Sequence, residues 1–88
     1  MPAISMFYGI IIRMQNEKGG KHNKPHIHAI YNEYEVVMDF QGNVLEGKLP
    51  MKQIKLLTAW IAIHEDELNA NWQLLCAGEG FFKIEPLR

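Results

Sequence analysis

The chain has 88 residues, of which 48% are hydrophobic and 22% are charged, and its formal net charge is −1. This length fits one domain spanning residues 1–88, and the composition excludes an intrinsically disordered chain. The single cysteine, Cys76, excludes an internal disulfide and a zinc site made of four thiolates. The longest apolar stretch is too short to span a bilayer and lacks the marks of a signal peptide. We therefore expect a cytoplasmic protein without membrane contact.

The small net charge hides an asymmetry along the chain. Residues 1–28 hold four basic residues against one acid, and residues 29–88 hold five basic residues against nine acids. The resulting charges, +3 and −4, are far from the strongly basic composition of nucleic-acid-binding domains. We interpret the basic residues before position 28 as a solvated surface loop, with nucleic acid as a less favoured partner.

Alternating apolar side chains predict a sheet in the first half of the chain. Between Ile4 and Met14 the alternation, rich in β-branched and aromatic residues, predicts one long strand with one buried face. Gly9 within this run is interpreted as a bulge or a close approach of another backbone. Residues 16–25 are polar and contain two glycines, so they are predicted to form a loop.

Further strands are predicted at residues 26–31, 33–40 and 44–48, joined by turns at Asn32 and at residues 41–43. The strand at 33–40 has an apolar face and an acidic face, and the acidic face is predicted to be solvated. The acidic residues are Glu33, Glu35 and Asp39. Such short connections predict an antiparallel meander of three to four strands.

The hydrophobic period changes after Pro50, a residue that suits the first turn of a helix. Apolar side chains then recur at steps of three and four residues from Ile54 to Leu75, which predicts one long helix or two shorter ones. A break is placed at residues 64–67, because acids there favour a new helix N-terminus. Glycines at 78 and 80 end this pattern.

The order of these elements predicts an α+β domain, in which one or two C-terminal helices pack on the antiparallel meander. Residues 1–49 are assigned to the sheet and residues 50–78 to the helical part. Residues 79–88 are assigned to a C-terminal tail or an edge strand, and in the second alternative residues 81–84 form a short final strand.

Three of the four histidines, His22, His26 and His28, lie within seven positions. On a strand, His26 and His28 point to the same face roughly 6.5 Å apart. They could share a divalent metal such as zinc, with His22 as a third ligand, or act as a general acid and base. The neighbouring lysines disfavour a cation, and the spacing is not a specific motif. We therefore favour a structural or surface role and expect no cofactor.

His64 lies on the apolar stripe of the predicted helices. It is interpreted as a histidine at the edge of the core, or as a catalytic residue that completes the site of the strand histidines. Trp60 forms a second apolar stripe with Leu56 and Ile63. Tryptophans at this spacing are usually core anchors. One small sheet face cannot cover both stripes, however, so an exposed Trp60 with Leu56 and Ile63 would mark a surface for a protein partner or a second copy.

Several segments together resemble one family over nearly the whole chain. They are the strand from Ile4 to Met14, Pro25-His26-Ile27-His28-Ala29-Ile30-Tyr31, Leu45-Glu46-Gly47-Lys48-Leu49-Pro50, Trp60 with His64, Leu68 with Trp72, and Ile84-Glu85-Pro86-Leu87. In these segments the chain is similar to the small bacterial family catalogued as domain of unknown function 4160. The resemblance implies no established activity. It implies genes encoded beside another small domain, with toxin–antitoxin-like or transcription-linked roles.

The histidine loop departs from the pattern of that family. The usual loop has an acidic residue before the first histidine and a Pro-Pro-His-Phe-His core, whereas this chain has Lys21 before His22 and Lys24-Pro25-His26-Ile27-His28. The resemblance therefore carries over His26, His28 and His22 as site candidates, without the acid.

We expect an interaction module rather than an enzyme, and one component of a paired-gene or toxin–antitoxin-like system. The first alternative is a phosphodiester hydrolase acting on RNA through His26, His28 and His64, with or without a metal ion. The second is a DNA-linked transcriptional regulator with a helix–turn–helix at residues 51–77. It ranks last because its second helix carries three acids and no basic residue.

Overall fold

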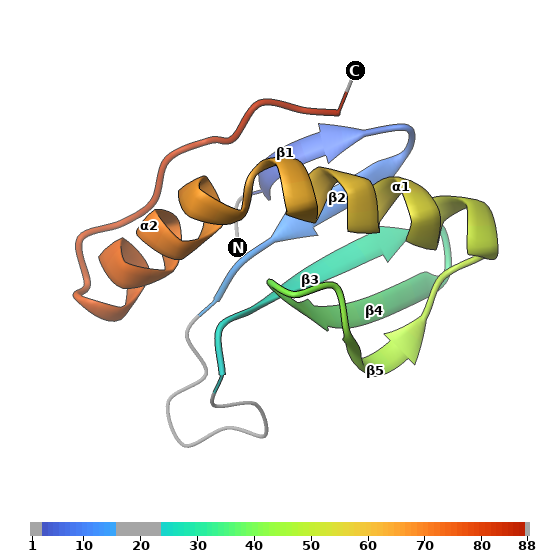
Figure 1. Cartoon of the computed structure of the whole chain (residues 1–88), viewed down its shortest axis with the longest axis horizontal. Coiled ribbons are helices and arrows are strands. Elements are labelled where there is room, and N and C mark those ends of the chain that lie inside the picture. The colour runs from blue at the N-terminus through green and yellow to red at the C-terminus, as the bar shows by residue number, and fades with distance from the viewer. Residues whose placement is uncertain (1–2, 16–23, 88) are drawn as a thin grey trace.

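The computed structural model describes residues 3–15 and 24–87 of the chain (Figure 1). Among these residues a five-stranded antiparallel sheet has the order β1-β2-β3-β4-β5, and two helices follow it. The elements are β1 (Ala3–Phe7), β2 (Ile10–Arg13), β3 (His26–Tyr31), β4 (Tyr34–Asp39), β5 (Val44–Lys48), α1 (Met51–Ile63) and α2 (Glu65–Cys76). The α+β class is therefore confirmed, and His22 lies outside the described residues.

The expected number of three to four strands is wrong, because residues 4–14 form a hairpin rather than one strand. β1 and β2 pair antiparallel, and Phe7 lies opposite Ile10. The turn between them consists of Tyr8 and Gly9, whose φ angles are 48° and 79°. A two-residue turn with two positive φ angles matches the twist of the flanking strands. Gly9 thus serves a turn and not a bulge.

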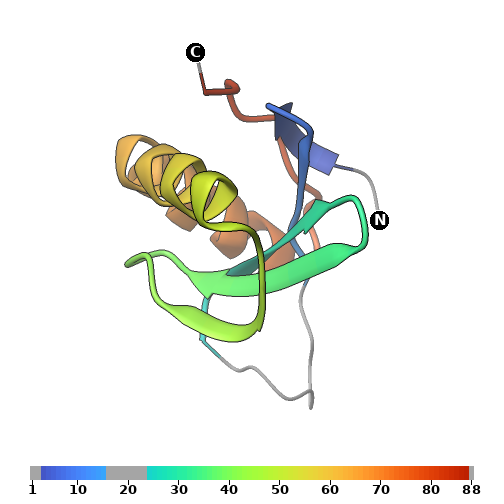
Figure 2. The same cartoon turned by 90° about the vertical axis from the view of Figure 1, so that its right-hand side faces the viewer.

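The core lies between the sheet and α1, which crosses one sheet face (Figure 2). Ile12, Ala29 and Val36 face each other across three neighbouring strands, and all are fully buried. The helices contribute buried side chains at Leu57, Trp60, Ile61 and Leu68. The acidic face of β4 is not uniformly solvated, because Asp39 is fully buried.

The helical half divides into two helices at His64, where the sequence placed a break. The N–H of His64 donates to the carbonyl of Trp60 at 3.0 Å, which completes the last turn of α1. Three acids, Glu65, Asp66 and Glu67, occupy the first turn of α2. Their charge favours a helix start, because the N-terminal end of a helix carries a partial positive charge.

The C-terminal segment, residues 79–87, returns across the molecule beside β1 without forming a strand (Figure 1). Of the two alternatives for this segment, the short final strand at 81–84 is therefore wrong, and the segment is a tail without strand structure. Ile84 is buried, and its N–H donates to the carbonyl of Ile4 at 2.8 Å. The indole Nε1 of Trp60 donates to the carbonyl of Glu85 at 2.9 Å. One backbone hydrogen bond and contacts with side chains thus take the place of a strand ladder.

Asn71 of α2 attaches the C-terminal segment at a third point, and replacing this side chain is expected to destabilise the fold. Its Nδ2 donates to the carbonyl of Phe82, and its Oδ1 accepts from the N–H of Phe82, both at 2.9 Å. The side chain is fully buried. We expect Asn71→Ala to lower the free energy of unfolding by roughly 2–3 kcal/mol, because two backbone groups lose their partner.

Urea denaturation followed by circular dichroism measures this effect. Asn69→Ala is the matched control, because Asn69 lies on the same helix and bonds only to the carbonyl of Glu65 within the described residues. Its loss should stay within about 0.5 kcal/mol. Equal effects of the two substitutions would contradict the role given to Asn71.

Candidate functional site

His26 and His28 lie on β3 and point to the same face, as the alternation of a strand requires. Their ring centroids are 5.3 Å apart, and the rings meet edge to face. This part of the sequence-based prediction is confirmed. Their surroundings differ, however, and these decide what each imidazole could do.

His26 is a buried residue of the interior. Its Nδ1 lies 2.7 Å from the carbonyl oxygen of Lys24, and its ring packs against Trp72 with centroids 5.2 Å apart. Because a carbonyl only accepts, Nδ1 carries the proton. Trp72 also contacts Phe40, with ring centroids 6.3 Å apart. His26 therefore joins the start of β3 to α2.

His28 is more accessible and has a carboxylate beside it. Its Nδ1 lies 3.2 Å from Oε2 of Glu35, and its side chain is 13% exposed. In the sheet register, Arg13 of β2 lies opposite His28. Glu35 holds the proton on Nδ1 and orients the ring. Arg13, His28 and Glu35 thus lie on three neighbouring strands, and Nε2 of His28 is buried.

Asp39 is the most heavily bonded side chain near these histidines. Its carboxylate accepts from Lys24 Nζ at 2.9 Å and from the backbone N–H groups of Gln41 and Asn43 at 3.0 and 2.8 Å. Asn43 Nδ2 adds a fourth bond at 3.1 Å. Burial raises the pKa of Asp39, but these bonds outweigh it and lower the pKa to about 2. Asp39 therefore fixes the turn after β4 and holds Lys24 beside His26.

His64 lies at the junction of the two helices, and within the described residues its ring contacts Trp60 and Glu67 rather than the strand histidines. Its ring packs against Trp60 with centroids 5.5 Å apart, and its Nδ1 lies 2.5 Å from Oε1 of Glu67. Within residues 3–15 and 24–87, no group of three or more His, Cys, Asp or Glu side chains could hold a metal ion. Zinc binding that involves His22, and the expected lack of a cofactor, both stay predictions.

Of the two interpretations of Trp60, the core anchor is confirmed and the exposed side chain is wrong. Trp60 is fully buried, and its ring lies 5.2 Å from that of Phe7. The C-terminal segment contacts Trp60 on the second helical stripe, and the sequence-based comparison of stripe area with sheet area did not include this segment. Leu56 is half-buried, while Ile63 is 64% exposed. Their role in a partner surface stays a prediction.

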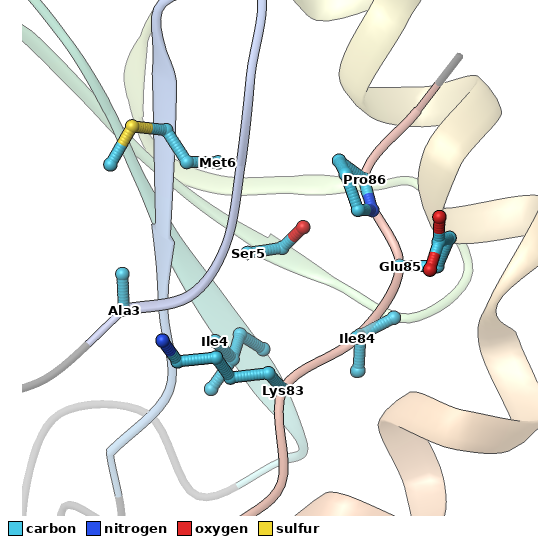
Figure 3. Close-up of a pocket in the computed structure, with 8 residues that line it drawn as sticks. All are labelled: Ala3, Ile4, Ser5, Met6, Lys83, Ile84, Glu85 and Pro86. Carbon is cyan, nitrogen blue, oxygen red and sulfur yellow. The ribbon is translucent and has the colours of Figure 1, made fainter.

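A surface that the sequence did not reveal lies at the β1 edge of the sheet. Met6 and Tyr8 are 59% and 58% exposed. Residues 3–6 and 83–86 line a groove of about 340 Å³ between β1 and the C-terminal segment (Figure 3). Ser5 faces this groove, and its buried hydroxyl has no hydrogen-bond partner in the described part of the chain. In the sequence, the only indication of this surface is that residues 3–12 contain no charged residue.

The described residues thus form a small α+β domain with internal histidines and an uncharged sheet edge. Residues 9–73 match the family model described as a domain of unknown function (DUF4160). The match covers most of the chain, so the chain belongs to this family and the resemblance found in the sequence is confirmed. No curated protein and no solved structure matches the chain. Neither helix in the described ranges is long and apolar enough to cross a membrane.

Proposed function

We propose that the chain is a small interaction module that acts by binding a protein partner or a second copy, as one component of a paired-gene, toxin–antitoxin-like system. The observation that carries this proposal is the hairpin formed by β1 and β2. It exposes Met6 and Tyr8, and no charged residue occurs between positions 3 and 12. Exposed apolar side chains gathered at one edge favour contact with another protein.

The placement of the histidines supports a structural rather than a catalytic use. His26 is fully buried between Lys24 and Trp72, and His64 contacts Trp60 and Glu67 within the helical layer. His26 thus joins β3 to α2, and His64 contacts both helices at their junction. We place the module in the cytoplasm, because an exposed free thiol at Cys76 suits a reducing compartment.

Co-expression with the product of the adjacent gene tests this function. With a tag on the neighbour alone, we expect this chain to co-purify in a fixed ratio through a second, size-exclusion step. In a second arrangement, the tagged neighbour is produced alone and then mixed with a lysate that contains the chain. Binding in this arrangement indicates a stable complex of two folded proteins, whereas binding only after co-expression indicates that the two must fold together. If the two products separate in both arrangements, the paired-gene role is wrong.

A further inference from the structure

The face of α1 that points away from the core is exposed along the whole helix. The buried residues of the helix are Gln53, Leu57, Trp60 and Ile61. The exposed residues recur at steps of three and four on the opposite side, and they are Met51, Lys52, Lys55, Ala59, Ala62 and Ile63. Ile63 alone is 64% exposed. The outer face of α1 thus offers apolar side chains to solvent.

Charge follows a fixed order along this face. Lys52 and Lys55 lie in its N-terminal half, and the exposed Asp66 lies in the first turn of α2, just beyond the C-terminal end of α1 (Figure 1). His64 donates to the carbonyl of residue 60 and accepts from the N–H of residue 68, so helical hydrogen bonds are made on both sides of the junction. The face therefore runs from positive, through apolar, to negative.

These charges are not neutralised by neighbours on the same molecule. Among residues 3–15 and 24–87, no ion pair includes Lys52, Lys55 or Asp66. Lys52 also lies in the first turn of α1, where the positive end of the helix disfavours a cation, and that turn contains no acid. A lysine that is unfavourable for its own helix indicates that its charge serves a contact outside the fold.

The order of charge makes this face complementary to itself. Lys52 and Asp66 each lie seven residues from Ala59, so an antiparallel second copy would place Lys52 of one copy opposite Asp66 of the other at both ends. Lys55 would lie opposite Ile63 in the same way, with its aliphatic stem over the isoleucine. The two Ala59 side chains would meet at the centre, where small residues allow helix axes to approach to roughly 8 Å.

We propose that the outer face of α1 binds the same face of a second copy of the chain, antiparallel about a two-fold axis at Ala59. The charge pattern favours a copy as the occupant, because the chain itself supplies the reversed order of charge. A parallel pair would bring like charges together. This contact leaves the hairpin of β1 and β2 to the protein partner. It rests on the proposed function as an interaction module, which co-purification with the neighbouring gene product tests separately.

Sedimentation velocity of the full chain at low ionic strength, up to millimolar concentration, tests the pairing. We expect a dimer, and Lys52→Glu and Asp66→Lys should each weaken self-association at least roughly tenfold, because like charges then meet at both ends. An equimolar mixture of these two variants should regain the dimer, since each variant carries the charge that the other lacks. Lys83→Glu is the matched control, because it makes the same change of charge at an exposed residue of the C-terminal segment and should leave the dimer intact. A monomeric wild type, a mixture that stays monomeric or an equal loss in Lys83→Glu would overturn the proposal.

Cross-linking at the axis gives a readout that does not depend on charge. In a Cys76→Ser background, Ala59→Cys places one thiol of each copy at the centre of the contact, and mild oxidation should link the copies by a disulfide. Ala70→Cys in the same background is the control, because Ala70 is exposed on α2 but lies far from the axis. It should cross-link at least roughly tenfold more slowly, because a disulfide needs its two Cα atoms within about 7 Å. Equal cross-linking rates in the two variants would contradict a two-fold contact at Ala59.

Discussion

Replacing Asp39 with alanine is expected to lower the free energy of unfolding by roughly 3–4 kcal/mol, because it removes a buried, charged acceptor of several hydrogen bonds. The Asp39 carboxylate is fully buried and accepts four hydrogen bonds, two of them from the backbone of Gln41 and Asn43. Its loss leaves both N–H groups without an acceptor and releases Lys24. Chemical denaturation at neutral pH measures the effect. The control is Glu33→Ala, at an exposed residue of the turn between β3 and β4. It should change the free energy of unfolding by less than about 0.5 kcal/mol.

The pH dependence of stability gives a separate signature of the same carboxylate. The pKa of Asp39 is lowered in the folded chain to about 2 from 3.8. A lowered pKa stabilises the folded state above the unfolded-state pKa, and this stabilisation is lost as the pH falls toward the folded-state pKa. We expect about 2 kcal/mol of stability to disappear between roughly pH 4 and pH 2. In Asp39→Asn this contribution should be missing, and an unchanged pH profile in that variant would contradict the assignment.

The element order was predictable from the sequence because it depends on local patterns. The change from alternating to helical period at Pro50 and the acids after His64 mark real boundaries. The hairpin between β1 and β2 was missed because its turn is Tyr8-Gly9. Asparagine or aspartate before glycine is the usual signal, and tyrosine rarely adopts a positive φ. The apolar run therefore resembles one continuous strand.

The candidate site was predictable only as far as strand geometry reaches. The shared face of His26 and His28 follows from alternation, and the ring distance of 5.3 Å confirms it. The burial of His26 depends on Trp72, which α2 brings to β3 from a distant part of the sequence. Likewise, Asp39 belongs to an acidic pattern that usually indicates a solvated face. Only the fold shows that a turn and Lys24 enclose it.

The misjudged exposure of Trp60 has the same physical origin. The sequence-based comparison set the area of two helical stripes against one sheet face. In the structure, the C-terminal segment also packs against this apolar surface. The C-terminal segment adds buried Ile84 and places the carbonyl of Glu85 on the indole N–H. A polar handle on a buried tryptophan usually finds an acceptor. A partner for the indole was therefore predictable, but its identity was not.

Trp60→Ala is accordingly expected to cost roughly 3–5 kcal/mol of unfolding free energy, the range for removing a buried tryptophan. The ring is fully buried and contacts both Phe7 and His64, so a cavity would open between the β1–β2 hairpin and the helices. Trp60→Phe separates packing from hydrogen bonding. It keeps most of the ring but leaves the carbonyl of Glu85 without its donor, at a cost of roughly 1–2 kcal/mol.

The two variants should also differ in where they loosen the molecule. In Trp60→Phe, amide exchange should accelerate at residues 82–85, because that segment loses its attachment to α1, while the amides of β3 and β4 stay protected. Trp72→Phe is the matched control, since Trp72 contacts His26 and Phe40 and, within the described residues, donates no hydrogen bond to residues 82–85. If amide exchange at residues 82–85 accelerates equally in both variants, a general destabilisation of the fold, and not the loss of the indole N–H, determines the exchange rate of this segment. A Trp60→Phe protein with unchanged exchange there would show that Asn71 and Ile84 suffice to hold it.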